Sequence, residues 1–319
     1  MNEITSHQYD LLTACALRVG GSSVDWSLIA RSAQTPDGLT ALLDGNVNED
    51  SPTARRALPL LREALPHLGD ARRRVDTELA AARTAGAHLV TVLDSGYPAN
   101  LRLVPNLPPF LFHLGPLEER DARSIAVVGT RAASEDGLRR SARMARELVP
   151  HDVVIMSGLA KGVDAAAHDA TLRAGGRTVA VMGTGIAAPV YPSQNRPLAR
   201  AILDHGGALL SQFWPTSGPA RWTFPRRNVV TSGTTRGSVV IEASSTSGAK
   251  MQARIAAEHG KLVFLIKSLA TSQPWAAKMI IEGRAIEVTR TSDILDRLGT
   301  AASIQQASQQ RQQLALAGL

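Results

Sequence analysis

Glycine-rich segments that directly follow apolar runs hold the residues best suited to bind an anion. Three such segments are present: Gly129-Thr130-Arg131, Ser157-Gly158-Leu159-Ala160-Lys161-Gly162 and Gly183-Thr184-Gly185. Glycine lets backbone N–H groups come close to a phosphate, and a following helix adds the positive end of its dipole. The Arg131 guanidinium could also hold a phosphate with two hydrogen bonds. The sequence therefore predicts an anion-binding edge.

Two common nucleotide-binding patterns are missing from these segments. Gly129 is followed by Thr130, Arg131 and Ala132, so the first segment is not G-x-G-x-x-G, and no acidic residue stands at the ribose-binding position. No G-x-x-x-x-G-K-[ST] occurs either. These observations argue against ordinary NAD binding and phosphate-loop NTPase chemistry. For any single segment, the alternative is a glycine that serves only a tight turn.

An acid-free stretch between Asp204 and Glu242 is the second candidate feature. It contains basic and aromatic residues, namely Arg221, Arg226, Arg227, Arg236, Trp214, Trp222 and Phe224. Phosphates attract cations while unpaired bases stack on rings, so this mixture is typical of single-stranded nucleic-acid binding. The alternative is that Trp222 and Phe224 belong to the core and the arginine side chains are solvated.

Groups that could support catalysis are few. Asp164 and His168 are four residues apart, which would place them on one helix face as an acid–base couple. The simpler interpretation, which we prefer, is that Asp164 braces its loop while His168 packs beside it. Neither Ser157 nor Ser211 lies in a G-x-S-x-G elbow, and no metal-ligand spacing occurs. We therefore expect no metal, no cofactor and no enzymatic activity.

The elements that must position these residues alternate between short apolar runs and helix-length stretches. The apolar runs span residues 124–128, 153–156, 178–182, 208–211, 238–241 and 262–266, and helices are expected over 135–148, 164–174, 196–205 and 249–259. Unbroken Val and Ile runs between helices indicate a parallel sheet covered on both faces. The prediction is an α/β fold with a Rossmann-like, doubly wound, mostly parallel sheet. In such a fold, ligands bind beyond the carboxyl ends of the strands.

Three regions are expected along the chain. Residues 1–84 show helical spacing and no strand pattern, which predicts a small all-helical accessory domain of the SAM/HhH-like kind, with Ser51 capping a helix that starts at Pro52. Residues 85–299 form the Rossmann-like domain and begin with extended segments. The Gln-rich tail, 300–319, is expected to be a frayed helix or disordered.

Composition narrows the class of protein further. The 319 residues include 35 Lys and Arg against 28 Asp and Glu, and this net charge of +7 weakly favours a polyanionic partner. Cys15 is the single cysteine, which excludes a disulfide framework and a cysteine-based zinc site. Neither a signal peptide nor a membrane-spanning apolar window is present, so we expect a cytoplasmic protein without a membrane partner.

Ordered motifs between about residues 88 and 299 resemble the DprA/Smf family of DNA-processing proteins. The motifs are Val127-Val128-Gly129-Thr130-Arg131, the segment from Ser157 to His168, Gly183-Thr184-Gly185, Tyr191-Pro192 with Asn195, Phe224-Pro225-Arg226-Arg227-Asn228, Val240-Ile241-Glu242-Ala243 and Ser247-Gly248. The earlier Ser95-Gly96-Tyr97-Pro98 and Leu107-Pro108-Pro109-Phe110-Leu111 are similar to the segment that leads into the family's sheet.

This resemblance implies a homodimer that binds single-stranded DNA, protects incoming strands and helps to load a RecA-type recombinase in natural transformation. By position, it assigns the nucleic-acid contacts to Gly129, Thr130, Arg131, Ser157, Gly158, Lys161, Gly162, Gly183, Gly185, Phe224, Arg226, Arg227, Asn228, Ser247, Gly248 and Lys250. It assigns pocket-shaping positions to Asp164, His168, Asn195 and Glu242.

Three departures from the family pattern predict a divergent rim. Gln212 stands where the family usually has an acidic residue, Lys267-Ser268 replaces a proline-glycine pair, and Ala277 lies where a Gly-Thr-Asn stretch is expected. Two other functions therefore stay open. One is a nucleotide-sensing or nucleotide-hydrolysing enzyme on the same scaffold, acting through Asp164, His168 and Glu242. The other is a partner-recruiting scaffold that docks through the helical first domain.

Overall fold

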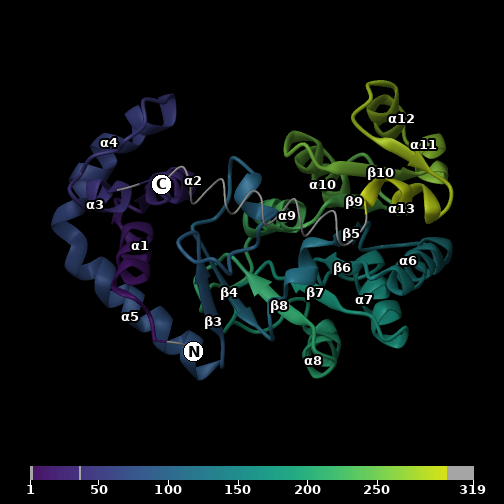
Figure 1. Ribbon diagram of the computed structural model, residues 1–319, viewed down its shortest axis with the longest axis horizontal. Coiled ribbons are helices and arrows are strands. Elements are labelled where there is room, and N and C mark those ends of the chain that lie inside the picture. The colour runs from purple at the N-terminus through teal and green to yellow at the C-terminus, as the bar shows by residue number, and fades with distance from the viewer. Residues whose placement is uncertain (1–2, 36, 300–319) are drawn as a thin grey trace.

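A nine-stranded sheet forms the centre of the protein in a computed structural model that describes residues 3–35 and 37–299 (Figure 1). Its strands, in spatial order, are β11 (Ile286–Val288), β10 (Leu262–Ile266), β9 (Gly237–Val240), β5 (Ser124–Val128), β6 (Val154–Ser157), β7 (Thr178–Val181), β8 (Ala208–Ser211), β4 (Phe110–Leu114) and β3 (His88–Thr91). All neighbours from β11 to β8 are parallel, and β4 and β3 add two antiparallel pairings at one edge. The predicted Rossmann-like, mostly parallel sheet is confirmed. The predicted Gln-rich tail lies outside the described residues.

Helices cover both faces of this sheet. The connecting helices are α6 (Glu135–Leu148), α7 (Val163–Arg173), α8 (Arg196–Asp204), α9 (Thr223–Thr234) and α10 (Gly248–Glu258). Figure 1 shows α6, α7 and α8 on one side of the strands and α9 and α10 on the other. The chain therefore winds in one direction from β5 to β8 and in the opposite direction from β9 onward. The loops after β5 and β9 diverge to opposite faces, which creates a topological switch point between these two strands.

Helix α9 falls in the acid-free stretch, where the sequence pattern predicts no helix. Buried residues surround its axis, among them Thr223, Arg227, Val230 and Thr234. A helix that is buried on several sides shows no single apolar stripe, and six of the eight buried residues of α9 are polar or charged, so the usual periodic signal is missing. Three further helices complete this part of the chain: α11 (Lys267–Ser272), α12 (Pro274–Ile281) and α13 (Ser292–Leu298).

Five helices occupy most of the first 84 residues: α1 (Ser6–Ala16), α2 (Trp26–Ala33), α3 (Gly38–Leu43), α4 (Pro52–Ala64) and α5 (Leu68–Thr84). The Ser51 hydroxyl accepts a hydrogen bond from the Ala54 N–H, so the predicted cap is confirmed. The expectation of no strand in this region is wrong. β1 (Arg18–Val19) and β2 (Ser22–Ser23) form a short antiparallel hairpin, and two-residue strands are too short to show an alternating pattern.

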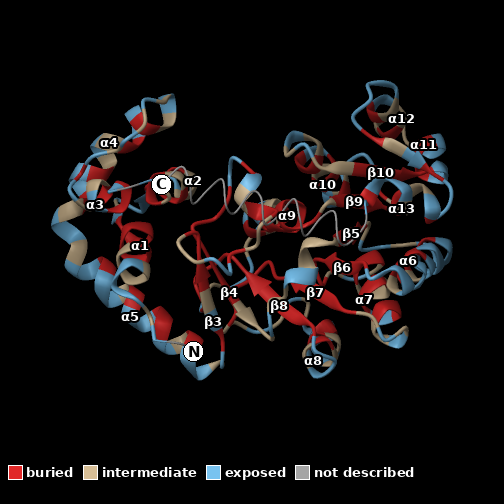
Figure 2. Ribbon diagram, viewed as in Figure 1, coloured by how far each residue is buried: buried red, intermediate tan, exposed pale blue. Residues whose placement is uncertain are grey.

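The N-terminal helices share one hydrophobic core with the sheet. The cluster runs from Leu11 and Leu28 to Leu209 on β8 without interruption. Three aromatic rings join the two parts: the ring centroid of Trp26 lies 5.0 Å from that of Phe110 and 6.0 Å from that of Trp214. Figure 2 shows the central strands β5 to β9 buried along their length, whereas α5 and α6 carry exposed outer faces. None of the described helices is long and apolar enough to cross a membrane.

A buried carboxylate also fastens α5 to the loop after β8. Glu78 accepts hydrogen bonds from the Thr216 backbone N–H at 2.9 Å and from the Thr216 hydroxyl at 2.8 Å. Replacing Glu78 by Ala leaves both donors without this acceptor, so we expect the free energy of unfolding to fall by about 1–3 kcal/mol. Urea denaturation measures this change, with Glu63→Ala on the exposed face of α4 as the control. Equal stability of the two variants would show that the Glu78–Thr216 hydrogen bonds do not stabilise the fold.

Candidate nucleic-acid interface

A cavity of about 370 Å³ lies at the switch point, where β5, β6 and β9 end and α9 and α10 pass. Ten of the predicted site residues line it: Gly129, Thr130, Arg131, Gly158, Asp164, Phe224, Arg227, Asn228, Ser247 and Gly248. Sequence reasoning missed the other lining residues: Val128, Ala160, Pro225, Thr231, Ser244, Ala249, Met251 and Gln252. Most of these flank predicted positions on α9 or α10. A correct α9 prediction would have placed Thr231 one helical turn beyond Arg227.

The loop after β5 presents Arg131 to solvent at one wall of this cavity. The Thr130 N–H donates to the Glu242 carbonyl at 2.7 Å, which ties the loop to the end of β9. The Cζ atom of Arg131 lies 4.9 Å from the centroid of the Phe224 ring. Arg131 itself is exposed. A cation is therefore held over an aromatic face with its guanidinium open to an incoming ligand.

The loop after β6 is braced from two sides. Asp164 accepts a hydrogen bond from the Gly158 N–H at 3.0 Å, and the Asn195 amide donates to the Leu159 carbonyl at 2.8 Å. Gly162 has φ +76°, and a Cβ there would lie 2.5 Å from the Thr130 carbonyl oxygen. The loop can approach its neighbour this closely because that position is glycine. Asp164 thus has the bracing role that the sequence favoured.

His168 does not form an acid–base couple with Asp164. Its ring is fully buried, its Nδ1 lies 2.6 Å from the Thr178 hydroxyl, and it does not line the cavity. Burial, together with the positive charge of Arg227, lowers the pKa of His168 to about 3. A histidine that stays neutral and enclosed in this way has a structural role, as the simpler interpretation predicted.

Arg227 lies beneath the cavity rather than on an open groove. Its side chain is buried, Nη1 donates to the Val181 carbonyl at 3.1 Å, and Nε has no partner within the described residues. A Cβ at Gly158 would lie 1.3 Å from Nη1, so a side chain there would displace the Arg227 guanidinium. Burial lowers the pKa of Arg227, Asp164 opposes this shift and Arg131 adds to it. A buried cation that has an N–H group without a hydrogen-bond partner favours the binding of an anion in the cavity beside it.

Exposed aromatic rings stand beside this cationic cavity. Trp222 is 56% exposed and Tyr191 is 45% exposed. The Tyr191 ring lies 5.6 Å from that of Phe224, and the Arg226 guanidinium lies 5.5 Å from the Trp222 ring. Trp214 belongs to the core instead. The alternative that Trp222 is a core residue is therefore wrong, and Phe224 is half-buried.

Arg236 cannot belong to one groove with the other arginines of that stretch. Its backbone N–H donates to the carbonyl of Ser124 at the start of β5, and its carbonyl accepts from Leu262 at the start of β10. It therefore lies at the amino ends of the strands, opposite the cavity. Because Arg227 is buried as well, the four arginines of the acid-free stretch do not lie together on one exposed surface. Sequence proximity could not show this, because α9 carries the chain from one edge of the sheet to the other.

The remaining predicted positions lie around the cavity rather than in its lining, and they are Ser157, Lys161, Gly162, His168, Gly183, Gly185, Asn195, Arg226, Glu242 and Lys250. Lys161 and Arg226 are exposed. Gly183 gives room to the Phe224 ring, and Gly185 gives room to the Trp214 carbonyl. Ser157 donates to the Val127 carbonyl at 2.6 Å, and Lys250 lies 6.0 Å from the Trp275 ring. None of the three positions that depart from the family pattern, Gln212, Lys267 and Ala277, lines this cavity.

The fold and this site define a Rossmann-like protein with an arginine-lined cavity at its switch point and aromatic rings near it. The chain belongs to the DNA recombination-mediator protein A family, which matches residues 88–299. This agrees with the resemblance seen in the motifs.

Individual relatives support the assignment. Protein Smf of Escherichia coli is 34% identical over 239 residues, covering 75% of this chain and 64% of that protein. DNA processing protein DprA of Streptococcus pneumoniae is 37% identical over 207 residues, covering 64% of this chain and 72% of the relative. The X-ray structure of DprA from that organism superposes with a TM-score of 0.71 at 29% identity, over 92% of this chain and 98% of that one.

A solved structure of DNA processing protein A from Helicobacter pylori shares the fold, with a TM-score of 0.59 at 22% identity over 66% of this chain and 95% of that one. Its description concerns the single-stranded DNA binding mode of that protein. The chain spans 64% of the Escherichia coli Smf and 56% of the Synechocystis Smf.

The buried neutral His168 predicts a pH dependence of stability. Its pKa in the folded protein is about 3, below the ordinary value of 6.5, so between these values only the unfolded chain takes up the proton. Stability is therefore lost as the pH falls below 6.5. From about pH 7 to about pH 4.5, we expect the unmodified protein to lose roughly 2–3 kcal/mol more unfolding free energy than His168→Gln. Urea denaturation at both pH values measures this, and parallel losses in the two proteins would show that His168 is not buried neutral.

Proposed function

We propose that this protein binds single-stranded DNA at the switch-point cavity, protects the strand and helps to deliver it to a RecA-type recombinase, as a mediator of recombination in natural transformation. The observation that carries the proposal is the pairing of cations with aromatic rings at and beside the cavity. Arg131 lies over Phe224 and Arg226 lies over Trp222, with the buried Arg227 below. Membership in the recombination-mediator family supports the same ligand class.

The chemistry of the site matches the two parts of an unpaired strand. Arg131 and Lys161 are exposed on neighbouring loops and would contact phosphate oxygens. Trp222 and Tyr191 expose ring surface on which unpaired bases can stack, and each stacked base contributes about 1–3 kcal/mol. Paired bases in a duplex do not offer their faces, so rings of this kind favour single strands over duplex. Stacking is also tolerant of sequence, so little base preference is expected.

Glycine loops and buried groups would shape the contact without touching the bases. Gly158 and Gly162 allow the two loops to lie against Arg227 and Arg131, respectively. Arg227 would act from below through its charge and its unpartnered Nε. Asp164 and Asn195 would hold the loop in place. In this proposal the protein acts by binding, with no bond made or broken.

Replacing both Arg131 and Lys161 by Ala should weaken binding to every oligonucleotide sequence alike. The loss of two phosphate contacts should reduce the slope of log K against log salt by about 1.4, since each contact to a single strand contributes about 0.7. Fluorescence anisotropy with oligo-dT and mixed-sequence oligonucleotides at several salt concentrations measures both effects.

Arg173→Ala is the matched control, because Arg173 lies on α7 and pairs with Asp169 at 3.0 Å on an exposed face. Unchanged binding in the Arg131→Ala/Lys161→Ala variant would reject the assignment of strand binding to these two residues beside the switch-point cavity. A titration with free dTMP separates strand binding from nucleotide binding. Tight dTMP binding with weak oligonucleotide binding would favour a nucleotide sensor or nucleotide-hydrolysing enzyme.

Delivery to a recombinase predicts a kinetic effect. On oligonucleotides coated with single-strand-binding protein, the unmodified protein should shorten the lag before RecA filaments form, and Arg131→Ala/Lys161→Ala should not. The rate of ATP hydrolysis by RecA reports filament growth and so measures the lag, with RecA alone as the reference. A homodimer, the commonest closed assembly, is part of the proposal and is checked by sedimentation velocity. An unaltered lag with the unmodified protein would rule out delivery while leaving strand binding intact.

A further inference from the structure

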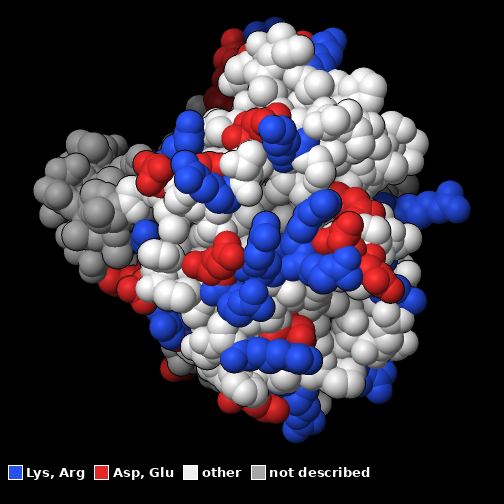
Figure 3. Space-filling view, turned by 90° about the vertical axis from the view of Figure 1, so that its right-hand side faces the viewer, with Lys and Arg blue, Asp and Glu red and all other residues white. Residues whose placement is uncertain are grey.

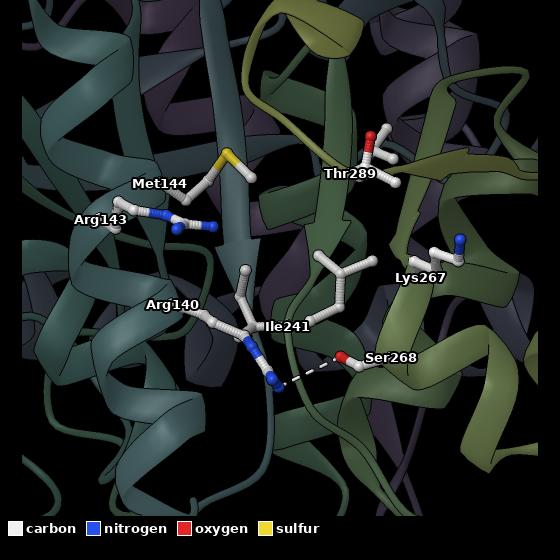
Figure 4. Close-up of a pocket in the computed structure, with 9 residues that line it drawn as sticks. Arg140, Arg143, Met144, Ile241, Lys267, Ser268 and Thr289 are labelled. Carbon is white, nitrogen blue, oxygen red and sulfur yellow. Dashed lines mark hydrogen bonds between the residues drawn. The ribbon is translucent and has the colours of Figure 1, made fainter.

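A second cavity, of about 360 Å³, opens on the same edge of the sheet (Figure 4). Its lining comes from α6 and from the ends of β9, β10 and β11, and consists of Arg140, Arg143, Met144, Ile241, Ile266, Lys267, Ser268, Val288 and Thr289. We call it the α6–α11 pocket. It shares no lining residue with the switch-point cavity.

The floor of the α6–α11 pocket is apolar and its rim is cationic. Ile241, Ile266 and Val288 are buried residues at the strand ends. Figure 4 shows Arg140 and Arg143 extending from α6 on one side, with Lys267 and Ser268 on the other. Figure 3 shows Lys and Arg side chains gathered across the middle of the face that carries α6 and α11–α13 in Figure 1, with acidic side chains among them. An anion with an apolar part suits such a lining.

Two of these cations have no carboxylate partner within the described ranges. Arg140 donates to the Ser268 hydroxyl at 3.1 Å and forms no ion pair there, and Lys267 forms none either. Arg143 lies 3.8 Å from Glu147, an exposed contact that contributes little.

The nearby carboxylates are already engaged. Glu147 also accepts a hydrogen bond from the Thr291 hydroxyl, and Asp293 accepts from the Thr289 N–H at 2.9 Å. Glu242, which follows Ile241, accepts from the Ser134 hydroxyl at 2.7 Å. None of the three lines the pocket, so its rim keeps a net positive charge.

The position of the pocket relates it to the switch-point cavity. β9 ends between the two: Ile241 lines the α6–α11 pocket, and Ser244 lines the switch-point cavity. Neighbouring strands lie about 4.8 Å apart, so the ends of β5, β9, β10 and β11 form one short row. A chain-like ligand held over β5 and β9 would reach β10 and β11 by continuing along this row.

We propose that the α6–α11 pocket is a second contact for single-stranded DNA, with a base on the apolar floor and the adjoining phosphate on Arg140 and Lys267. The proposal rests on the proposed function, which places the strand at the switch-point cavity. It also gives a role to Lys267-Ser268, the pair that departs from the family pattern. An inorganic phosphate would leave the apolar floor empty, so a nucleotide unit fits better.

The test compares a short and a long oligonucleotide. Oligo-dT of about 5 nucleotides covers one cavity, whereas oligo-dT of about 20 nucleotides can reach both. For Arg140→Ala/Lys267→Ala, we expect roughly tenfold weaker binding of the long oligonucleotide, a salt slope lower by about 1.4 and unchanged binding of the short one. Arg139→Ala/Arg254→Ala is the control of equal charge, because both arginines pair with carboxylates on their own helices.

Each result supports or overturns the proposal. If the double variant binds both oligonucleotides normally, the second contact is wrong and the proposed function stands. If the unmodified protein binds neither oligonucleotide, the proposed function fails and the second contact fails with it. If Arg140→Ala/Lys267→Ala loses binding of free dTMP but keeps oligo-dT binding, the pocket takes free nucleotides and the strand contact is rejected.

Discussion

The pairing of β5 with β9 is the interaction on which the rest of the site depends. Val127 faces Val239 and Val128 faces Val240 in the parallel register, and the Thr130 N–H extends the contact to the Glu242 carbonyl. Both strands then end at the same edge, but their helices leave to opposite faces. Side chains cannot close the crevice between two diverging loops, so a cavity remains there. The pairing of β5 with β9 therefore fixes the positions of the loops that carry the candidate phosphate-binding residues.

Burial of Arg227 under the cavity shows how the fold combines stability with binding. An isolated buried cation is costly, and here Asp164 and the Val181 carbonyl compensate it only in part, since Nε is left without a partner within the described residues. Buried polar groups that lack a hydrogen-bond partner are most often found at functional sites, where a ligand can supply the partner. The exposed Arg131 adds a second positive charge nearby, which raises the electrostatic potential at the cavity but weakens the folded state. An anionic ligand relieves both effects at once.

The row of strand ends explains why one edge of the sheet can hold an extended ligand. Parallel strands bring all their carboxyl ends to this edge, and the helices that follow them separate it into pockets. The switch-point cavity and the α6–α11 pocket differ in their walls: the first has glycine loops and a ring, the second has an aliphatic floor. Both keep positive charge at the rim. The N-terminal helices pack at the other end of the sheet, against β3, β4 and β8, and so leave this row open.

Local features of the sequence determined six of the seven parallel strands that the structure describes, the glycine loops and the position of Arg131, because apolar periodicity and glycine content act over a few residues. They also predicted the bracing role of Asp164. They did not predict the short strand β11. The tertiary structure alone decided that Arg227 is buried and that Arg236 lies at the opposite end of the strands. Helix α9 shows no apolar stripe because protein surrounds it on several sides, so its neighbours, and not its own spacing, specify it. The same holds for the α6–α11 pocket, whose cations follow β5 and β10 in the chain and meet only when both strands pair with β9.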